Sequence, residues 1–283
     1  MQPKSFEWQF YKPAAATQGF IDFLNQQTSI AITPGITDRH QVISCDFEGQ
    51  GYIIKRFSPS DNRRWDRKIE LTLKSYWISG AEKSFRGARW LWEAGIPGIK
   101  PTAWAVHGRG YHQVSYFVYE RIEAQGEVQD LLEQDSLSVQ QERQLIQDMA
   151  KISHQVHQAG YRHTDIVPHN FLAQQQPQGQ IKLLLIDTDK VEKASALGKI
   201  FKRTKLFFDL RCLRRLRFSP EQLSLFFHQY FQGGTRLRYL QQWYFWVRGG
   251  FNLYKRKKMR KRLPRHLLKL NLTLLLGQQS KKN

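Results

Sequence analysis

The strongest constraint on the fold of this 283-residue chain is a polar loop between a predicted helix and a predicted strand. Residues 161–170 read YRHTDIVPHN, so that Asn170 follows Asp165 at a spacing of five. Residues 181–187 read IKLLLID, and this mainly apolar run predicts a short buried strand. Asp187 therefore stands at the carboxyl end of a strand, where an acidic side chain can leave the core and bind a metal.

The segment before the loop predicts a helix over residues 138–160. Its apolar residues recur at helical spacing, and it ends at Gly160, a residue type that commonly stops helices. The apolar positions are Leu145, Ile146, Met149, Ile152 and Val156. The helix would therefore lead directly into the loop.

A helix, a loop, a strand and an Asp in this order are typical of a phosphotransferase. Phosphoryl transfer mainly requires bound metal, neutralised phosphate charge and one oriented hydroxyl group. In the kinase pattern H-R-D-x-x-x-x-N, the Asp accepts the hydroxyl proton, while the Asn and a later Asp hold the metal ions. Asp165 is therefore the predicted catalytic base, and Asn170 and Asp187 are the predicted metal ligands. The string alone also occurs by chance, so its context carries the prediction.

A lysine that binds the nucleotide phosphates is expected on a strand in the amino-terminal part. Residues 51–57 read GYIIKRF, which predicts a strand that carries Lys55. The alternative is a lysine that only faces water on an edge strand. Residues 46–51 contain two glycines but no complete glycine-rich phosphate loop.

A kinase lysine usually pairs with a glutamate on the helix that follows. Residues 81–93 predict this helix, and Glu82 is the candidate partner. Glu70 and Glu93 are alternatives, and an ordinary surface glutamate is a further one.

Residues 114–120, VSYFVYE, predict a strand that runs into the link between two lobes. The adenine of ATP is expected beside this link, so Tyr119, Glu120 and Ile122 are candidate nucleotide-binding residues. Backbone groups make most such contacts, and the residue types therefore neither prove nor exclude the assignment.

Taken together, the strings HTD (163–165), HNFL (169–172), IDTDK (186–190) and WLWEAGI (90–96), with Lys55, resemble one family. It is the family of bacterial lipopolysaccharide inner-core sugar kinases, which phosphorylate Kdo or heptose and are similar to reduced protein kinases. The resemblance covers about residues 50–230. It implies the same roles for Asp165, Asn170, Asp187 and Lys55, and it implies ATP and Mg²⁺ as cofactors.

The chain departs from the family at two positions. Ser84 precedes Phe85 where members often carry a glutamate, and Thr188 follows Asp187 where an apolar residue is usual. The HTD and DTD strings are closer to the Kdo kinases, whereas NFL partly resembles the HFL of the heptose kinases. The acceptor sugar therefore stays open.

The expected fold class is α+β, with a two-lobed, protein-kinase-like fold. A small, mainly β N-lobe would occupy residues 1–120, a larger helical C-lobe residues 121–250, and a basic amphipathic tail residues 251–283. The length suits one kinase domain and leaves no room for a second enzyme. Two cysteines and no amino-terminal signal pattern favour a cytoplasmic location.

The charge is distributed unevenly along the chain. Residues 1–198 hold 22 basic and 22 acidic side chains, whereas residues 199–283 hold 22 basic and 2 acidic ones. The net charge of +20 therefore lies in the carboxyl-terminal part, which suits a polyanionic partner.

Bulky aromatic residues alternate with cations in residues 236–262, and leucines follow in residues 266–277. This mixture favours an anionic membrane surface over nucleic acid, and the leucine-rich stretch is too short to span a bilayer. No zinc-finger spacing or RNA-binding aromatic string occurs. We therefore expect peripheral binding at the inner face of the cytoplasmic membrane, with lipid A or the lipopolysaccharide core as acceptor.

Three alternatives to the sugar kinase remain. A protein kinase would need an activation segment closed by Ala-Pro-Glu, which residues 188–208 do not show. A small-molecule kinase of the aminoglycoside or choline type commonly has Gly at the position of Thr164. A catalytically silent module that binds membrane or nucleic acid would turn over no ATP.

Overall fold

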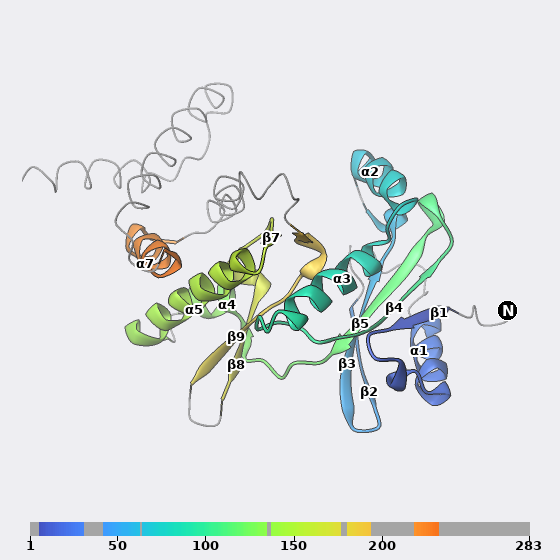
Figure 1. The fold of residues 1–283 in the computed structure, drawn as a ribbon, viewed down its shortest axis with the longest axis horizontal. Helices are drawn as coiled ribbons and strands as arrows, with labels where there is room; N and C mark the ends of the chain where they lie inside the picture. The colour runs from blue at the N-terminus through green and yellow to red at the C-terminus, as the bar shows by residue number, and fades with distance from the viewer. Residues whose placement is uncertain are drawn as a thin grey trace, which may run out of the picture. The chain divides into compact units, whose positions relative to one another are not determined.

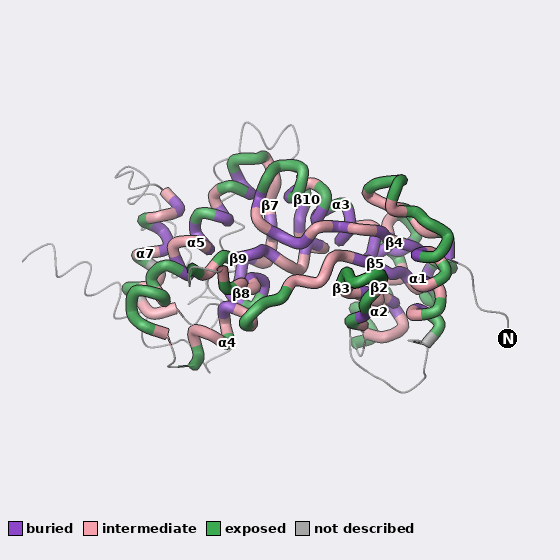
Figure 2. Tube along the Cα trace, turned by 90° about the horizontal axis from the view of Figure 1, so that it is seen from below, coloured by how far each residue is buried: buried purple, intermediate pink, exposed green. Residues whose placement is uncertain are grey.

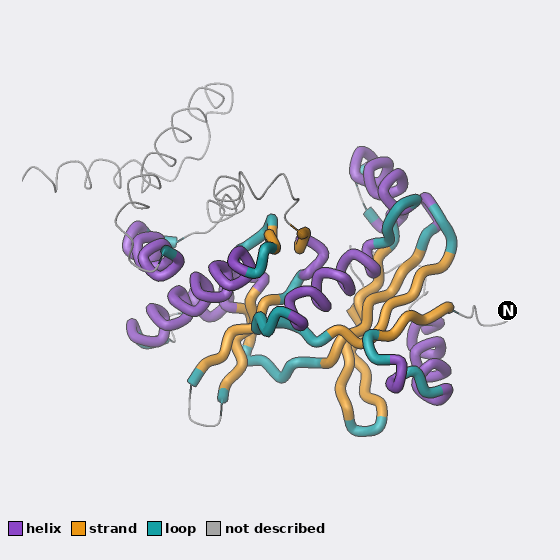
Figure 3. Tube along the Cα trace, viewed as in Figure 1, coloured by secondary structure: helices purple, strands orange, loops and turns teal. Residues whose placement is uncertain are grey.

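The computed structural model describes residues 6–30, 42–62, 64–134, 137–176, 180–193 and 218–231. Helices and strands are mixed along these residues, which confirms the predicted α+β composition (Figure 1, Figure 3). The chain divides into two compact units, Met1–Ser136 with Gln155–Arg215, and Leu137–His154 with Leu216–Asn283. The basic tail, and the aromatic and cationic strings before it, lie outside the described residues.

An antiparallel sheet of five strands organises the amino-terminal part. The strand order is β1-β4-β5-β3-β2. Its members are β1 (Glu7–Phe10), β2 (Val42–Phe47), β3 (Gln50–Phe57), β4 (Pro101–His107) and β5 (Val114–Glu120). β3 and β5 confirm the two strands predicted from the sequence, and they are neighbours in the sheet.

Helix α1 (Gln18–Ile30) covers one face of this sheet. Phe20 and Leu24 of α1 pack with Ile54, Tyr116 and Val118 of the central strands. Successive side chains of a strand point to opposite faces, so the residues next to these in β3 and β5 face away from α1. In Figure 2 the buried residues of the sheet appear as purple segments along β4 and β5.

Helix α3 (Gly80–Glu93) covers the opposite face. Its buried residues Ala81, Phe85 and Ala88 pack with Phe117 of β5. Lys55 is paired with Phe117 across the ladder, and it therefore points to the same face. The alternation of β3 thus buries Ile54 under α1 and directs Lys55 toward the α3 side.

Local signals explain the bounds of α3. The side chain of Ser79 accepts a hydrogen bond from the backbone N–H of Glu82 at 3.0 Å, which caps the first turn. At the other end, Gly95 takes a left-handed φ of 69°. Helix α2 (Trp65–Ser75) precedes α3, and the short helices η1 (Pro13–Ala15), η2 (Pro59–Asp61) and η3 (Gly110–His112) connect strands and helices.

The second half of the larger unit contains short strands around the polar loop. These are β6 (Gly126–Glu127), β7 (Tyr161–His163), β8 (Phe171–Gln175), β9 (Ile181–Leu185) and β10 (Val191–Lys193), with α4 (Val128–Glu133), η4 (Pro168–Asn170) and η5 (Thr188–Lys190). β8 and β9 form an antiparallel hairpin beside β6, and β10 pairs with β7. The predicted strand before Asp187 is β9.

The predicted helix before the loop is α5 (Val139–Gln158). All five of its predicted apolar positions are buried. In the smaller unit, α7 (Pro220–Tyr230) begins with a capping box, in which Ser219 and Gln222 exchange hydrogen bonds. Within that unit Tyr230 of α7 makes an edge contact with the ring of His154 at 5.5 Å. Of the helices that the structure describes, none combines the length and apolar character needed to cross a bilayer.

Candidate active site

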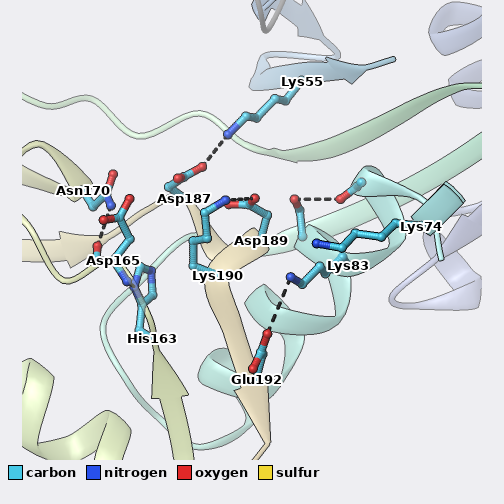
Figure 4. Close-up of polar contacts among 12 residues, drawn as sticks. Lys55, Lys74, Lys83, His163, Asp165, Asn170, Asp187, Asp189, Lys190 and Glu192 are labelled. Atoms are coloured by element: carbon cyan, nitrogen blue, oxygen red, sulfur yellow. Dashed lines mark hydrogen bonds and ion pairs between the residues drawn. The ribbon is translucent and has the colours of Figure 1, made fainter. Parts of the chain in front are cut away.

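Two hydrogen bonds hold the polar loop from within. The backbone N–H of Asp165 donates to Nδ1 of the buried His163 at 3.2 Å. The side-chain Nδ2 of the buried Asn170 donates to the carbonyl oxygen of Asp165 at 2.7 Å. His163 and Asn170 therefore fix the backbone of Asp165, whose carboxylate lies beside Asn170 (Figure 4).

Burial keeps His163 in its neutral form. It lowers the pKa of His163 to about 4, although the negative charges of Asp187 and Asp165 oppose the change. Because Nδ1 accepts a hydrogen bond, the remaining ring proton belongs on Nε2. His163 thus supports the loop, and its ring stays neutral near pH 7.

Asp187 lies at the point where the chain leaves β9. Its φ of 57° and ψ of 52° are left-handed, which is uncommon for a residue other than glycine. The backbone N–H of the preceding Ile186 donates to the carbonyl oxygen of Asn170 at 2.8 Å. The left-handed turn and this hydrogen bond place Asp187 beside the polar loop.

Lys55 and Asp187 form a short ion pair. Lys55 Nζ lies 2.6 Å from Asp187 Oδ1, and the two side chains are 17% and 27% exposed (Figure 4). Burial alone would raise the pKa of Asp187, but the charge and hydrogen bond of Lys55, helped by Lys190, lower it to about 2. Asp187 is therefore ionised at any physiological pH.

A second carboxylate, that of Asp189, follows in η5. Its Oδ2 accepts a hydrogen bond from Lys190 Nζ at 2.5 Å. Burial, and then the negative charge of Asp187, raise the pKa of Asp189, while Lys190 opposes the rise. The site therefore holds two neighbouring carboxylates with opposite pKa shifts, a pattern that recurs in functional sites.

Helix α3 docks closely on the turn after Asp187. A Cβ atom built on Gly87 would lie 2.1 Å from the carbonyl oxygen of Thr188, so only glycine permits this approach. The Thr188 hydroxyl donates to the carbonyl oxygen of Ser84 at 2.8 Å. The two positions that depart from the family pattern are thus bonded to each other.

An ion pair adds to this contact. Lys83 Nζ of α3 lies 3.8 Å from Glu192 Oε1 of β10 (Figure 4). Both ends of the short segment 188–192 are therefore attached to α3.

Glu82 lies in the first turn of α3 with a side chain that is only 17% exposed. Its carboxylate pairs with Arg86 of the same helix at 2.5 Å. Among the described ion pairs, Lys55 has Asp187 as its partner and none joins it to Glu82. The structure therefore does not bring the predicted Lys55 and Glu82 pair together.

The three candidate nucleotide-binding residues lie at the end of β5 and just beyond it. Tyr119, Ile122 and Ile186 pack against the buried residues between α3 and β5. Burial, followed by the charge of Asp187, raises the pKa of Tyr119 to about 12. Glu120 forms an ion pair with Lys100. Tyr119 is thus electrostatically linked to the predicted metal ligand.

Several contacts around the site have no signal in the sequence. Trp90 of α3 stacks on Tyr161 of β7 with ring centres 5.9 Å apart, and Lys193 Nζ lies 5.0 Å from the Trp90 ring centre. The Thr188 and Ser84 bond is a further example. Each joins segments that are distant in sequence, so no local pattern predicts them.

The oxygen atoms of Asp187 and Asn170 suit Mg²⁺, a hard cation that also binds phosphate groups. Within the part of the chain that the structure describes, no cluster of three or more His, Cys, Asp or Glu side chains could hold a metal by itself. Mg²⁺ usually takes one or two carboxylates and completes its shell with water and substrate phosphates. One carboxylate from Asp187 and the amide oxygen of Asn170 fit that requirement.

Comparisons with known proteins agree with this site. The model of the lipopolysaccharide kinase (Kdo/WaaP) family matches residues 72–230, more than half of the chain. No curated protein sequence matches. A solved structure titled "WaaP in complex with acyl carrier protein" matches with a TM-score of 0.56 and 17% identity, over 90% of this chain and 98% of that one. At this identity the structural match shows a shared fold.

Proposed function

Since the chain belongs to the lipopolysaccharide kinase (Kdo/WaaP) family, we propose that it phosphorylates a Kdo or heptose hydroxyl of the lipopolysaccharide inner core. The members of this family are phosphotransferases that act on sugar hydroxyl groups. One observation carries the proposal furthest. The site brings Lys55 together with Asp187 and with the loop that carries Asp165 and Asn170. More than 100 residues separate Lys55 from these other residues in the sequence.

Each residue of the site has a separate role in phosphate transfer. Asp165 accepts the proton of the sugar hydroxyl, whose oxygen then forms a bond to the γ-phosphorus of ATP. The bond from that phosphorus to the bridging oxygen breaks, and ADP leaves. Asn170 serves twice, because its Nδ2 holds the loop while its Oδ1 is available to a metal. Asp187 is the second ligand.

Mg²⁺, when bound, neutralises phosphate charge. Asp187 would then be a ligand of the metal, and the Lys55 ammonium would need a new partner. We propose that Lys55 then contacts the ATP phosphates and that Glu82 leaves Arg86 to support it. This exchange accounts for the difference between the structure and the predicted pair.

The two-lobed protein-kinase-like arrangement is part of the same proposal. The five-stranded sheet with α3 would form the N-lobe, within residues 1–120, and residues 121–250 would form the C-lobe. The adenine of ATP would lie beside Tyr119, Glu120 and Ile122 at the link. Domain limits at these positions, with a tail over residues 251–283, remain our proposal.

The location of the enzyme follows from its acceptor. A lipopolysaccharide precursor is held in a membrane by its lipid A, and the basic carboxyl-terminal region would attract the anionic surface of that membrane. We propose a peripheral position at the inner face of the cytoplasmic membrane. Nucleic acid is the less favoured partner.

The test is transfer of labelled phosphate from ATP, with Mg²⁺, to purified inner-core acceptors that carry Kdo or heptose. Asp165→Asn should lower the transfer rate by about 10²–10⁴-fold, since it removes the base but keeps the shape of the side chain. Asp148→Asn, which changes a half-buried carboxylate of α5 away from the polar loop, is the matched control. Equal rates for Asp165→Asn and the parent protein would defeat the proposal, and the acceptor that is labelled identifies the sugar.

A further inference from the structure

An apolar stripe on the surface of α2 is not explained by the active site. In the part of the chain that the structure describes, six of the nine exposed large apolar side chains lie on α2, the turn after it and η3. We call this set the α2 stripe. Its members, with exposed fractions, are Trp65 (74%), Ile69 (49%), Leu73 (54%), Tyr76 (62%), Trp77 (80%) and Tyr111 (43%).

The stripe faces outward because the other side of α2 is attached to the protein. The hydroxyl of the buried Ser75 donates to the carbonyl oxygen of Gly110 at 3.2 Å, and Gln113 Nε2 donates to the carbonyl oxygen of Ser75 at 2.9 Å. These bonds fix the rotation of the helix. Trp65, Ile69 and Leu73, spaced by four residues, then project from one exposed face.

An apolar face of this kind normally marks an interaction site. Surface helices of soluble proteins usually turn their apolar side inward, and α2 does the reverse. Tyr76 and Trp77 extend the stripe beyond the last helical turn, and Tyr111 extends it onto η3. The stripe therefore combines side chains of α2, of the turn after it and of η3, which is distant in sequence but is hydrogen-bonded to the end of α2.

The charges beside the stripe are mainly positive. Residues 64–77 contain four basic and two acidic side chains. Arg64 pairs with Asp66, and both Arg67 and Lys74 pair with Glu70, so the carboxylates are neutralised and cationic charge remains. Lys68 Nζ lies 5.8 Å from the ring centre of Tyr111.

Trp and Tyr side chains with neighbouring cations are typical of helices that lie in the interface of an anionic bilayer. The aromatic rings occupy the headgroup level, and the cations reach the lipid phosphates. A second copy of the chain fits less well, because a two-fold contact through this face would bring the same cations together. Charge complementarity therefore favours lipid.

We propose that α2 inserts the α2 stripe into the headgroup region of an anionic phospholipid membrane. The contact would hold the enzyme at the surface where its lipid-linked acceptor lies. The role of this contact in reaching the acceptor rests on the proposed function. The membrane contact itself can be measured without any transfer reaction.

The experiment compares the full-length protein with the double variant Trp65→Ser/Trp77→Ser. Both tryptophans are exposed, so the variant should fold normally, which circular dichroism can verify. Trp92→Ser is the matched control, since Trp92 is also exposed (42%) but lies on α3 outside the stripe. Binding to phosphatidylethanolamine and phosphatidylglycerol vesicles is measured at high salt, where attraction through the basic tail is screened.

We expect the double variant to lose about tenfold in vesicle affinity, and Trp92→Ser to bind like the parent protein. Brominated lipids should quench the fluorescence of the parent protein, and the double variant should lose this quenching. Transfer to a vesicle-embedded acceptor should fall by about tenfold, while transfer to the detergent-dispersed acceptor stays unchanged.

Equal vesicle affinity and quenching in the double variant would overturn the inference. A parent dimer that the double variant converts to a monomer, without a change in vesicle binding, would also overturn it in favour of a second copy. Loss of vesicle binding in the double variant, in a protein that transfers phosphate to no acceptor, would support the membrane contact and defeat the proposed function.

Discussion

The α-carbon of Gly87 lies against the carbonyl oxygen of Thr188, so closely that a Cβ atom on Gly87 would come within 2.1 Å of that oxygen. Thr188 directly follows Asp187, the predicted metal ligand. The backbone of the site is therefore in direct contact with the inner face of α3. A change at Gly87 should reach the chemistry without touching any substrate.

Gly87→Ala should destabilise the protein by about 1–3 kcal/mol, because α3 or η5 must move to admit the methyl group. Alanine favours a helix more than glycine does, so a surface site would give the opposite result. Denaturant unfolding measures the change. Phosphate transfer should also fall, since the turn that carries Asp187 shifts.

Arg89→Ala is the control for this prediction, because Arg89 is a neighbouring α3 residue with a 52% exposed side chain. It should leave both stability and transfer nearly unchanged. A Gly87→Ala protein more stable than the parent would show that α3 does not approach Thr188 as described.

Lys55→Met should lower phosphate transfer by about 10²–10³-fold, because it removes the cation that is proposed to contact the ATP phosphates. Steady-state kinetics with varied ATP measures this loss. Lys151→Met, which alters an exposed lysine of α5, should transfer at the parent rate. Transfer by Lys55→Met within twofold of the parent would return Lys55 to the role of a structural partner for Asp187.

Glu82→Gln tests whether Glu82 exchanges Arg86 for Lys55 when ATP binds. We expect transfer to fall by about tenfold or more, because Lys55 would lose its supporting carboxylate. Arg86→Gln removes the competing partner and should leave the rate equal to that of the parent or above it. Kinetics on both variants, beside the parent, decides the question. Equal losses in the two variants would mean that the Glu82 and Arg86 pair matters only for the helix.

The elements that the sequence predicts are those with a local pattern. The strand at 51–57, the strand at 114–120, the helix at 81–93 and the helix at 138–160 all occur, with bounds shifted by at most two residues. Each carries its own periodicity or stop signal. The order of loop, β9 and Asp187 follows directly from such patterns.

The features that the sequence does not predict depend on contacts between distant segments. The strand order β1-β4-β5-β3-β2 joins segments far apart in the chain. The Lys55 and Asp187 pair spans 132 residues. The pairing of Glu82 with Arg86 depends on how α3 is rotated against the sheet. The composition of the chain and the spacing of its residues do not determine which distant segments come into contact.

His163 should make the folded protein sensitive to acid. Its pKa is about 4 in the folded protein because the ring is buried, compared with 6.5 for an exposed imidazole. Between these two values the unfolded chain binds a proton that the folded protein does not. Stability therefore rises with pH across this interval, and the contribution of His163 is lost as the pH falls through it.

The effect amounts to roughly 3 kcal/mol between the two ends of the interval. Denaturant unfolding at several pH values measures it for the parent and for His163→Gln, whose amide oxygen can still accept the Asp165 N–H. The variant should show a shallower loss on acidification, because glutamine does not titrate. Parallel curves for the two proteins would show that carboxylates alone produce the acid sensitivity.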